Sequence, residues 1–181
     1  METTATYDSA TDEFIVNSPT PLSQKYWITN GACHAEWAVV FAQLITNDKK
    51  EGVHAFIVRI RNSDRTPCKG VCIEDMGIKI GLNGIDNARI AFNNVRIPRT
   101  YLLNRFSDVH KGGKYESKIT KKRDRFLYIA NRLLSGRVCI SAMSIGGGKS
   151  IIYDTIKYAL QRKGVGASGK SDTPIMAYQL Q

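Results

Sequence analysis

Residues 24–31, Gln-Lys-Tyr-Trp-Ile-Thr-Asn-Gly, combine side chains that can bind a planar ligand. The aromatic pair and Ile28 favour a strand, and Thr-Asn-Gly adds a hydroxyl, an amide and a flexible backbone where that strand should end. Trp27 offers a flat apolar face to an aromatic ring system, and Thr29 with the N–H groups after it can hydrogen-bond the polar edge of that ring. The alternative is a buried strand that closes on an ordinary turn.

Three other motifs suggest a binding site, but each one lacks a feature that such a site requires. Gly-Gly-Lys-Ser at residues 147–150 resembles the end of a phosphate-binding P-loop, but Met143 stands where that motif needs a glycine, and no strand precedes it. Residues 164–169 have the glycine spacing of a dinucleotide fingerprint, but they follow a predicted helix, which favours a helix cap and loop. Cys68 and Cys72 lack the second ligand pair of a zinc site, so we expect no metal. No Ser-His-Asp or Cys-His-Asn set can be assembled from the sequence.

Composition limits the class of protein. The 181 residues allow one well-buried domain, or one domain and part of another, and the 43% hydrophobic content is that of a globular protein. No apolar run approaches the roughly 20 residues that span a bilayer, and residues 1–8 do not resemble a signal peptide, so we expect an intracellular protein. The formal charge of +10 favours a polyanionic partner without choosing among nucleic acid, an acidic membrane and a phosphorylated cofactor. The four cysteines are expected to be free thiols.

The first hundred residues show the composition of short strands separated by turns. Two prolines in residues 18–22 separate a first hairpin from the Trp27 strand, and a polar turn at residues 47–52 joins the strands of a second hairpin. Besides the Trp27 strand, the predicted strands cover residues 2–7, 13–17, 38–45, 53–60, 71–74 and 89–92. These strands predict an antiparallel β-domain.

After Pro98 the pattern changes, and from Arg123 the apolar period is about 3.6 residues, which predicts one long helix. Its apolar stripe consists of Phe126, Ile129, Leu133, Leu134, Val138, Ile140, Ile145, Ile151, Ile152, Ile156 and Leu160. Three consecutive glycines at residues 146–148 each cost about 1 kcal/mol relative to alanine in a helix interior. They need close neighbours, or they cause a kink.

A basic segment, residues 111–125, joins the two parts. Lysines and arginines cluster at its end, at Lys118, Lys121, Lys122, Arg123 and Arg125. A solvated linker explains such a charge run better than a phosphate or nucleic-acid patch, and no RNA-binding signature accompanies it. We therefore predict a β-domain at residues 1–110, a basic linker at 111–125 and a helical part at 126–181, with neither nucleic acid nor a membrane as partner.

Several segments together carry a resemblance to a known family. Residues 25–31 contain Lys-x-Trp-Ile-Thr-Asn-Gly, residues 77–99 contain a Lys-x-Gly-x-Asn-Gly-x-Asp-Asn run that ends in Arg-Ile-Pro-Arg, and Tyr-Ala-x-x-Arg ends at Arg162. Taken in order, with residues 2–14 before them, these segments resemble the middle of a peroxisomal-type acyl-CoA oxidase of the acyl-CoA dehydrogenase superfamily. The run in residues 77–99 separates oxidases from dehydrogenases and is similar to the plant type assigned to medium-length acyl chains.

The resemblance implies an α+β fold, with an antiparallel β-barrel or sandwich middle domain followed by a long α-helix from a truncated helical bundle. The sequence departs from the family pattern at three places. Ala88 replaces a glycine, Val165 replaces the Phe that usually follows the arginine, and the triple glycine interrupts a helix that is normally continuous.

The resemblance also implies a flavin-dependent reaction. In the family, a glutamate removes the α-proton of a fatty acyl-CoA, the β-hydrogen leaves as hydride to FAD, and trans-2-enoyl-CoA forms. Oxygen then reoxidises the flavin, which yields hydrogen peroxide. The implied partners are fatty acyl-CoA, molecular oxygen and a second subunit of a homodimer, and the implied compartment is the peroxisome.

The family's binding residues carry over to matching positions of this sequence. The expected flavin-lining residues are Trp27, Ile28, Thr29 and Asn30. The expected acyl-CoA-lining residues are Asp86, Asn87, Ala88 and Arg89, with Arg96 as a nearby cation. Arg162 is expected to bind the FAD diphosphate of the neighbouring subunit, which suits a bidentate guanidinium. Without the resemblance, an Asx turn between strands is the favoured interpretation of Asp86 and Asn87.

Two family elements are expected outside these residues: a flavin-binding segment before residue 2 and the catalytic glutamate after Gln181. We therefore expect a fragment that neither retains FAD nor oxidises acyl-CoA by itself, and the final Gln-Leu-Gln is no peroxisomal tripeptide. Three alternatives remain. They are a fragment of an acyl-CoA dehydrogenase that uses a protein electron acceptor, a basic β-barrel that binds nucleic acid, and a non-catalytic structural subunit.

Overall fold

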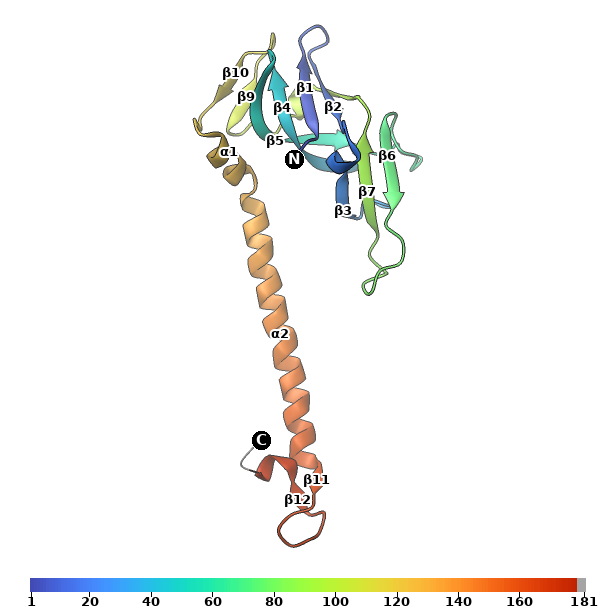
Figure 1. Ribbon diagram of the computed structural model, residues 1–181, viewed down its shortest axis with the longest axis vertical. Helices are drawn as coiled ribbons and strands as arrows, with labels where there is room; N and C mark the ends of the chain where they lie inside the picture. The colour runs from blue at the N-terminus through green and yellow to red at the C-terminus, as the bar shows by residue number, and fades with distance from the viewer. Residues whose placement is uncertain (179–181) are drawn as a thin grey trace. The chain divides into compact units, whose positions relative to one another are not determined.

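The computed structural model describes residues 1–178, which form two compact units, Met1–Ala130 and a second unit that begins at Asn131 (Figure 1). The first unit contains the strands β1 (Thr4–Asp8), β2 (Glu13–Asn17), β3 (Lys25–Thr29), β4 (Trp37–Thr46), β5 (Lys49–Arg59), β6 (Val71–Asp75), β7 (Asn87–Phe92), β8 (Val95–Pro98), β9 (Ser107–Val109) and β10 (Tyr115–Ser117). It also contains short 3-10 turns at Pro21–Ser23 and Arg99–Tyr101, and the helix α1 (Lys122–Ile129).

The strands of the first unit form three open sheets. Five strands pair in the order β5-β4-β1-β2-β8, three in the order β3-β7-β6, and β9 pairs with β10. All pairs are antiparallel except one, because Thr4–Asp8 runs parallel to β4, with Thr4 opposite Gln43. The α+β class with mostly antiparallel sheets is therefore confirmed. The strictly antiparallel arrangement is wrong at this pair, and the sheets of residues 1–178 do not close into a barrel.

The β4–β5 hairpin closes more tightly than the expected six-residue turn. Only Asn47 and Asp48 separate the strands, with φ of 48° and 59°, which is the two-residue turn that suits strand twist. A register shift after Leu44 then adds one residue to β5, and Gly52 adopts a φ of 97° beside it. Residues 49–52 therefore continue the strand as a bulged ladder, a feature that their polar composition concealed.

The core of this unit lies between the sheets, where alternate strand residues point inward. The buried-to-partly-buried alternation of β1 and β2 is regular, and Phe14 and Phe56 are fully buried with ring centroids 5.1 Å apart in an edge-on arrangement. The other fully buried aliphatic side chains include Val16, Leu44, Val58 and Ile60. This core fixes β4 and β5, and the smaller sheet packs against it.

The segment expected as a basic linker contains structure of its own. Residues 115–117 form β10, and Arg125 in α1 is buried, where its guanidinium donates to the carbonyls of Ile119, Thr120 and Glu51. The Arg125 Nη1 also donates to Tyr115 Oη at 2.9 Å. Arg125 therefore anchors α1 to the β-sheet unit and does not contribute to an exposed cationic patch.

The second unit consists of α2 (Asn131–Gln161), the short pair β11 (Lys163–Gly164) and β12 (Thr173–Pro174), and a 3-10 turn at Ile175–Ala177. The single long helix expected from Arg123 is two helices, because Ala130 ends α1. The three glycines do not interrupt α2, and a Cβ added to any of them would have no neighbour within 4 Å other than the nearby backbone of the helix itself. Among residues 1–178, no helix has the length and hydrophobicity required to cross a membrane.

Candidate functional site

The end of β3 is bulged, and this bulge turns Trp27 outward. Lys25 pairs with Ile90 and Ile28 with Ala88, so β3 has one more residue than β7 between these two pairs. Trp27 takes the extra place with a φ of 61°, which is unusual for a bulky residue, and its side chain is 53% exposed. Backbone strain of this kind persists where surrounding structure enforces it and is concentrated at functional sites. Trp27 is therefore not a core residue of an ordinary strand.

The Thr29 hydroxyl belongs to a network with β7 that reaches Trp27 through Lys79. Thr29 pairs with Asn87, and Asn87 Nδ2 donates to Thr29 Oγ1 at 3.4 Å. Asn87 Oδ1 accepts from Lys79 Nζ at 2.5 Å, and the same Nζ lies 5.9 Å from the centroid of the Trp27 ring. Because the Thr29 oxygen accepts from the amide, its O–H remains available to donate to a ligand.

The turn after Thr29 is closely fitted against β7. Asn30 has a φ of 61°, and its N–H donates to the Asp86 carbonyl at 3.1 Å. Gly31 is buried, and a Cβ at this position would lie 2.9 Å from the Ala88 Cβ. The glycine of Thr-Asn-Gly is therefore required by close approach to β7.

The Asp86 carboxylate faces this turn. Its side chain is 9% exposed, and Oδ2 accepts from the Cys33 N–H at 2.5 Å and lies 3.3 Å from His34 Nδ1. Burial by itself would raise the pKa of Asp86, but the hydrogen bonds from Cys33 and His34 hold that pKa below its ordinary value. Oδ1 is buried and has no hydrogen-bond partner among residues 1–178.

Two cations in this region were missed by the sequence reasoning. Lys79 is one of many lysines in the chain, although its place in the glycine-rich run of residues 77–99 was a usable signal. Arg61 is 30 residues from Gly31, yet its Nη1 donates to the Gly31 carbonyl at 2.8 Å. No local pattern in the sequence indicates a contact of that range.

A shallow cleft of about 220 Å³ adjoins β3 and is lined by Tyr26, Asp75, Met76 and Arg89. A larger cleft of about 730 Å³ includes Trp37, Arg59 and Tyr101, and the Arg59 guanidinium lies 5.7 Å from the centre of the Trp37 ring system. The first of these clefts is lined by Tyr26, the neighbour of Trp27 on β3, which makes it the better candidate for a ligand of Trp27.

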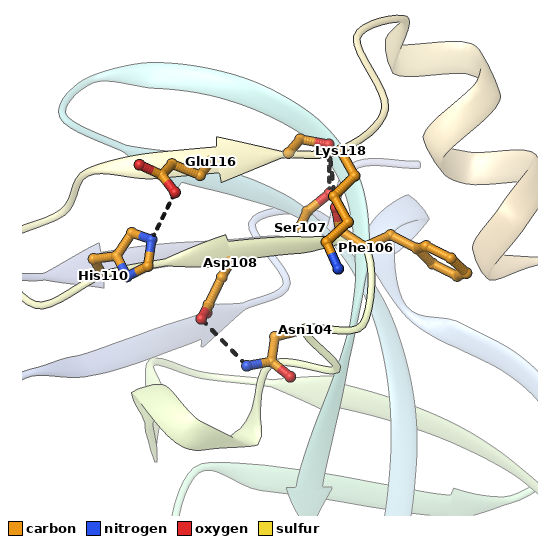
Figure 2. Close-up of a pocket in the computed structure, with 8 residues that line it drawn as sticks. Asn104, Phe106, Ser107, Asp108, His110, Glu116 and Lys118 are labelled. Atoms are coloured by element: carbon orange, nitrogen blue, oxygen red, sulfur yellow. Dashed lines mark hydrogen bonds and ion pairs between the residues drawn. The ribbon is translucent and has the colours of Figure 1, made fainter.

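The cleft in Figure 2 has a volume of about 490 Å³ and lies beside β9 and β10. Four of its polar side chains bind in pairs: His110 Nε2 lies 3.1 Å from Glu116 Oε2, and Asn104 Nδ2 donates to Asp108 Oδ2 at 3.2 Å. Each of these four side chains therefore has a partner within the cleft. In the described part of the chain, no group of three or more His, Cys, Asp or Glu side chains is placed to hold a metal ion.

Comparison with known proteins identifies the family. Residues 1–95 match the family model of the acyl-CoA dehydrogenase middle domain. The chain is 47% identical over 163 residues to the peroxisomal acyl-coenzyme A oxidase 3 of Arabidopsis thaliana, covering 90% of this chain and 24% of that protein. It superposes on the crystal structure of acyl-CoA oxidase 1 from Yarrowia lipolytica with a TM-score of 0.88 and 36% identity, over 98% of this chain and 25% of that one.

The chain belongs to the acyl-CoA oxidase family.

This family member spans about a quarter of the length of the relatives it matches, including the human peroxisomal acyl-coenzyme A oxidase 3, which is 39% identical and of which it covers 26%. A solved relative from Caenorhabditis elegans, acyl-CoA oxidase 1, is complexed with FAD and ATP, at 30% identity and a TM-score of 0.78 over 99% of this chain and 26% of that one. The donor set at β3 fits a flavin: an exposed indole can cover the ring, and a free hydroxyl hydrogen can meet its polar edge.

The remaining residues carried over from the oxidase family lie in different surroundings. Ala88 is fully buried on β7 opposite Ile28 of β3, and Arg89 is exposed and forms an ion pair with Glu74. Arg96 lies on β8, in the five-stranded sheet, and binds Asp8 and Glu13 at 3.0 Å each. Arg162 is exposed directly after α2, in the second unit. The structure thus brings residues 27–30 together with Asp86, Asn87 and Ala88, whereas the three arginines lie on other elements or point to other partners.

Proposed function

We propose that this chain contributes the flavin-contacting β-domain of an FAD-dependent oxidase that converts fatty acyl-CoA to trans-2-enoyl-CoA with formation of hydrogen peroxide. The observation that carries the proposal is the exposed Trp27 on the same strand as Thr29, whose O–H is available to donate, in an acyl-CoA oxidase family member. Bound FAD supplies the redox chemistry by accepting the electrons of the dehydrogenation. The peroxisome is the proposed compartment, since relatives in Arabidopsis and human are named peroxisomal oxidases.

Each residue at the end of β3 has a distinct proposed role. The Trp27 indole covers the face of the flavin ring and excludes water from it, and the Thr29 hydroxyl donates to an acceptor on the ring edge. Ile28 is partly buried against the core, so it fixes the strand and presents its backbone. Asn30 is exposed at the first position of the turn and offers its amide to the same ligand.

The arginines are proposed to meet the phosphates of the ligands. Arg89 is about half exposed, and its surface ion pair with Glu74 is weak enough to be exchanged for a phosphate of CoA. Arg96 has both of its partners on β1 and β2, so its proposed contribution is the electrostatic field at the acyl-CoA. Arg162 is proposed to bind the FAD diphosphate of a second subunit in a homodimer, where its planar guanidinium suits two phosphate oxygens.

The tryptophans of the chain provide a direct test. The sequence contains two, Trp27 and Trp37. FAD titrated into the purified 181-residue chain should quench the fluorescence of Trp27 along a saturable curve, after correction for flavin absorption. Trp27→Phe should abolish this quench, and Thr29→Val should weaken binding by about fivefold, since a typical net hydrogen bond contributes about 1 kcal/mol.

Trp37→Phe is the matched control, because Trp37 is also partly exposed but lies at the start of β4, and it should leave the saturable quench intact. A quench that never saturates, or one that survives Trp27→Phe and disappears with Trp37→Phe, would contradict the proposed flavin site. We further expect the purified chain to retain no visible flavin absorbance and to release no peroxide with acyl-CoA.

One observation favours a second candidate, an acyl-CoA dehydrogenase with a protein electron acceptor, because the matching family model is that of the dehydrogenase middle domain. The named relatives are oxidases, which favours the first proposal. Acyl-CoA-dependent peroxide release without an added acceptor, measured on an enzyme that contains this segment, separates the two.

A further inference from the structure

Arg61 is a buried cation whose charge is not met by a carboxylate. The residue is 4% exposed, and its guanidinium donates to three carbonyls of the turn after β3: Nη1 to Gly31 at 2.8 Å and to Ala35 at 3.0 Å, and Nη2 to Ala32. Among residues 1–178, no Asp or Glu forms an ion pair with it. A buried charge is costly unless nearby groups compensate it, so the groups that compensate the charge of Arg61 need to be identified.

The Asp86 carboxylate lies on the other side of the same turn. Its Oδ2 accepts from the Cys33 N–H, and its backbone carbonyl accepts from the Asn30 N–H. The Ala32 C=O and the Cys33 N–H belong to one peptide group, and in a trans peptide they point in opposite directions. One peptide group therefore has a guanidinium at its oxygen and a carboxylate at its N–H, which is the favourable end of the peptide dipole for each charge.

We propose that Arg61 and Asp86 act as a charge pair through the Ala32–Cys33 peptide group, and that this pair holds the turn that places Thr29 and Asn30. Both are then positioning residues for the flavin-binding end of β3, and that last step rests on the proposed function. The Oδ2 atom of Asp86 binds the turn, and it does not contact the acyl-CoA.

The surroundings of both residues agree with this assignment. The Ile60 and Arg61 N–H groups both donate to the Glu36 carbonyl, at 2.8 and 3.2 Å. The backbone of Arg61 is therefore fixed to the C-terminal end of the turn. The guanidinium reaches the three carbonyls through two separate nitrogens of its planar fork, and the single ammonium nitrogen of lysine does not reproduce that geometry. Gly31 has no Cβ, and one added there would lie 2.9 Å from the Ala88 Cβ, so the turn approaches β7 closely where Arg61 binds it.

Hydrogen exchange of the Cys33 amide, followed by NMR in the 181-residue chain, tests the pairing. Arg61→Met and Asp86→Asn should each lower the protection of the Cys33 amide on the order of tenfold, while the Val58 amide in β5 keeps its protection. The double variant should lose no more than either single variant, because both substitutions break one shared arrangement. Losses that multiply in the double variant, or an unchanged Cys33 amide in Arg61→Met, would overturn the proposal.

Arg65→Met is the matched control, since Arg65 also donates to a carbonyl of this segment, that of His34 at 3.2 Å, but is exposed. It should leave Cys33 protection unchanged. If Arg61→Met unfolds the chain, so that Val58 loses protection too, Arg61→Lys keeps the positive charge without the fork of donors and gives the same test.

The FAD titration separates this inference from the proposed function. Arg61→Met should weaken the saturable Trp27 quench while Trp27 itself is unchanged. If the unsubstituted chain shows no FAD quench but the Cys33 protection pattern is non-additive, the charge pair stands and the flavin assignment fails. If the quench is present and Arg61→Met leaves it unaltered, the positioning role is refuted.

Discussion

The two units of the chain differ in how many of their apolar side chains they bury. In Met1–Ala130, Phe14, Phe56 and Ile60 are fully buried, whereas in α2 Val138, Met143 and Ile151 are 70%, 75% and 69% exposed. The β-sheet unit closes its own core, and α2 carries the extended apolar surface that is typical of a bundle helix. The stability of the described chain is therefore expected to reside in the β-sheet unit.

The largest expected effect tests this contrast directly. Phe56→Ala removes a fully buried ring that packs edge-on against Phe14, and it should lower the free energy of unfolding by about 3–5 kcal/mol. Ile152→Ala in α2 removes a side chain that is 60% exposed and should change it by less than about 0.5 kcal/mol. Urea denaturation followed by circular dichroism measures both. Comparable losses would show that the α2 surface is packed in solution.

Glycine substitutions sharpen the same contrast with opposite signs. Gly31→Ala should destabilise the β-sheet unit by about 1–3 kcal/mol, because the new Cβ would lie 2.9 Å from the Ala88 Cβ and 3.0 Å from the Ile28 carbonyl oxygen. Gly147→Ala should instead stabilise α2 by about 1 kcal/mol, since nothing other than the nearby backbone of the helix itself lies within 4 Å of the added methyl group. Thermal unfolding and helix-specific hydrogen exchange report the two effects. A loss of stability in Gly147→Ala would reveal close neighbours of the triple glycine.

The smallest expected effect concerns pH and the network that ties α1 to the sheet. His54 is buried, with Nδ1 3.0 Å from the Gly52 carbonyl and Nε2 3.0 Å from Tyr115 Oη. Because a carbonyl only accepts, Nδ1 carries the proton, so Nε2 accepts from Tyr115, whose oxygen accepts from Arg125. Burial lowers the pKa of His54, and the charged form would face the Arg125 guanidinium.

The sign of the pH dependence follows from this shift. Below about pH 6.5 the unfolded chain binds the proton on His54 more readily than the folded chain does. Stability should therefore fall as the pH decreases from about 6.5 toward the lowered pKa of the folded chain. Above about pH 6.5 this contribution to stability should be constant. Urea midpoints measured across this range should show the slope in the unsubstituted chain and in His34→Gln, and lose it in His54→Gln. An unchanged slope in His54→Gln would exclude His54 as its source.

The sequence predicted the local features well and the long-range contacts poorly. The strand at Glu13–Asn17 and the strand that contains Trp27 were predicted from composition. The family was predicted from the resemblance of several motifs, and the comparisons confirm it. The strands at Ser107–Val109 and Tyr115–Ser117 were missed, because three residues give too little alternation to recognise. The flavin and acyl-CoA roles of the predicted site residues stay predictions.

What the sequence by itself determined is the set of side chains at the end of β3 and the class of fold, since strand periodicity, turn composition and the motif around Trp27 are local properties of the chain. Only the tertiary structure decided that Trp27 faces outward, that Asp86 and Arg61 meet at one peptide group, and that Arg96 belongs to another sheet. These outcomes depend on register and on residues far apart in the chain, where the pairing of whole strands fixes each partner.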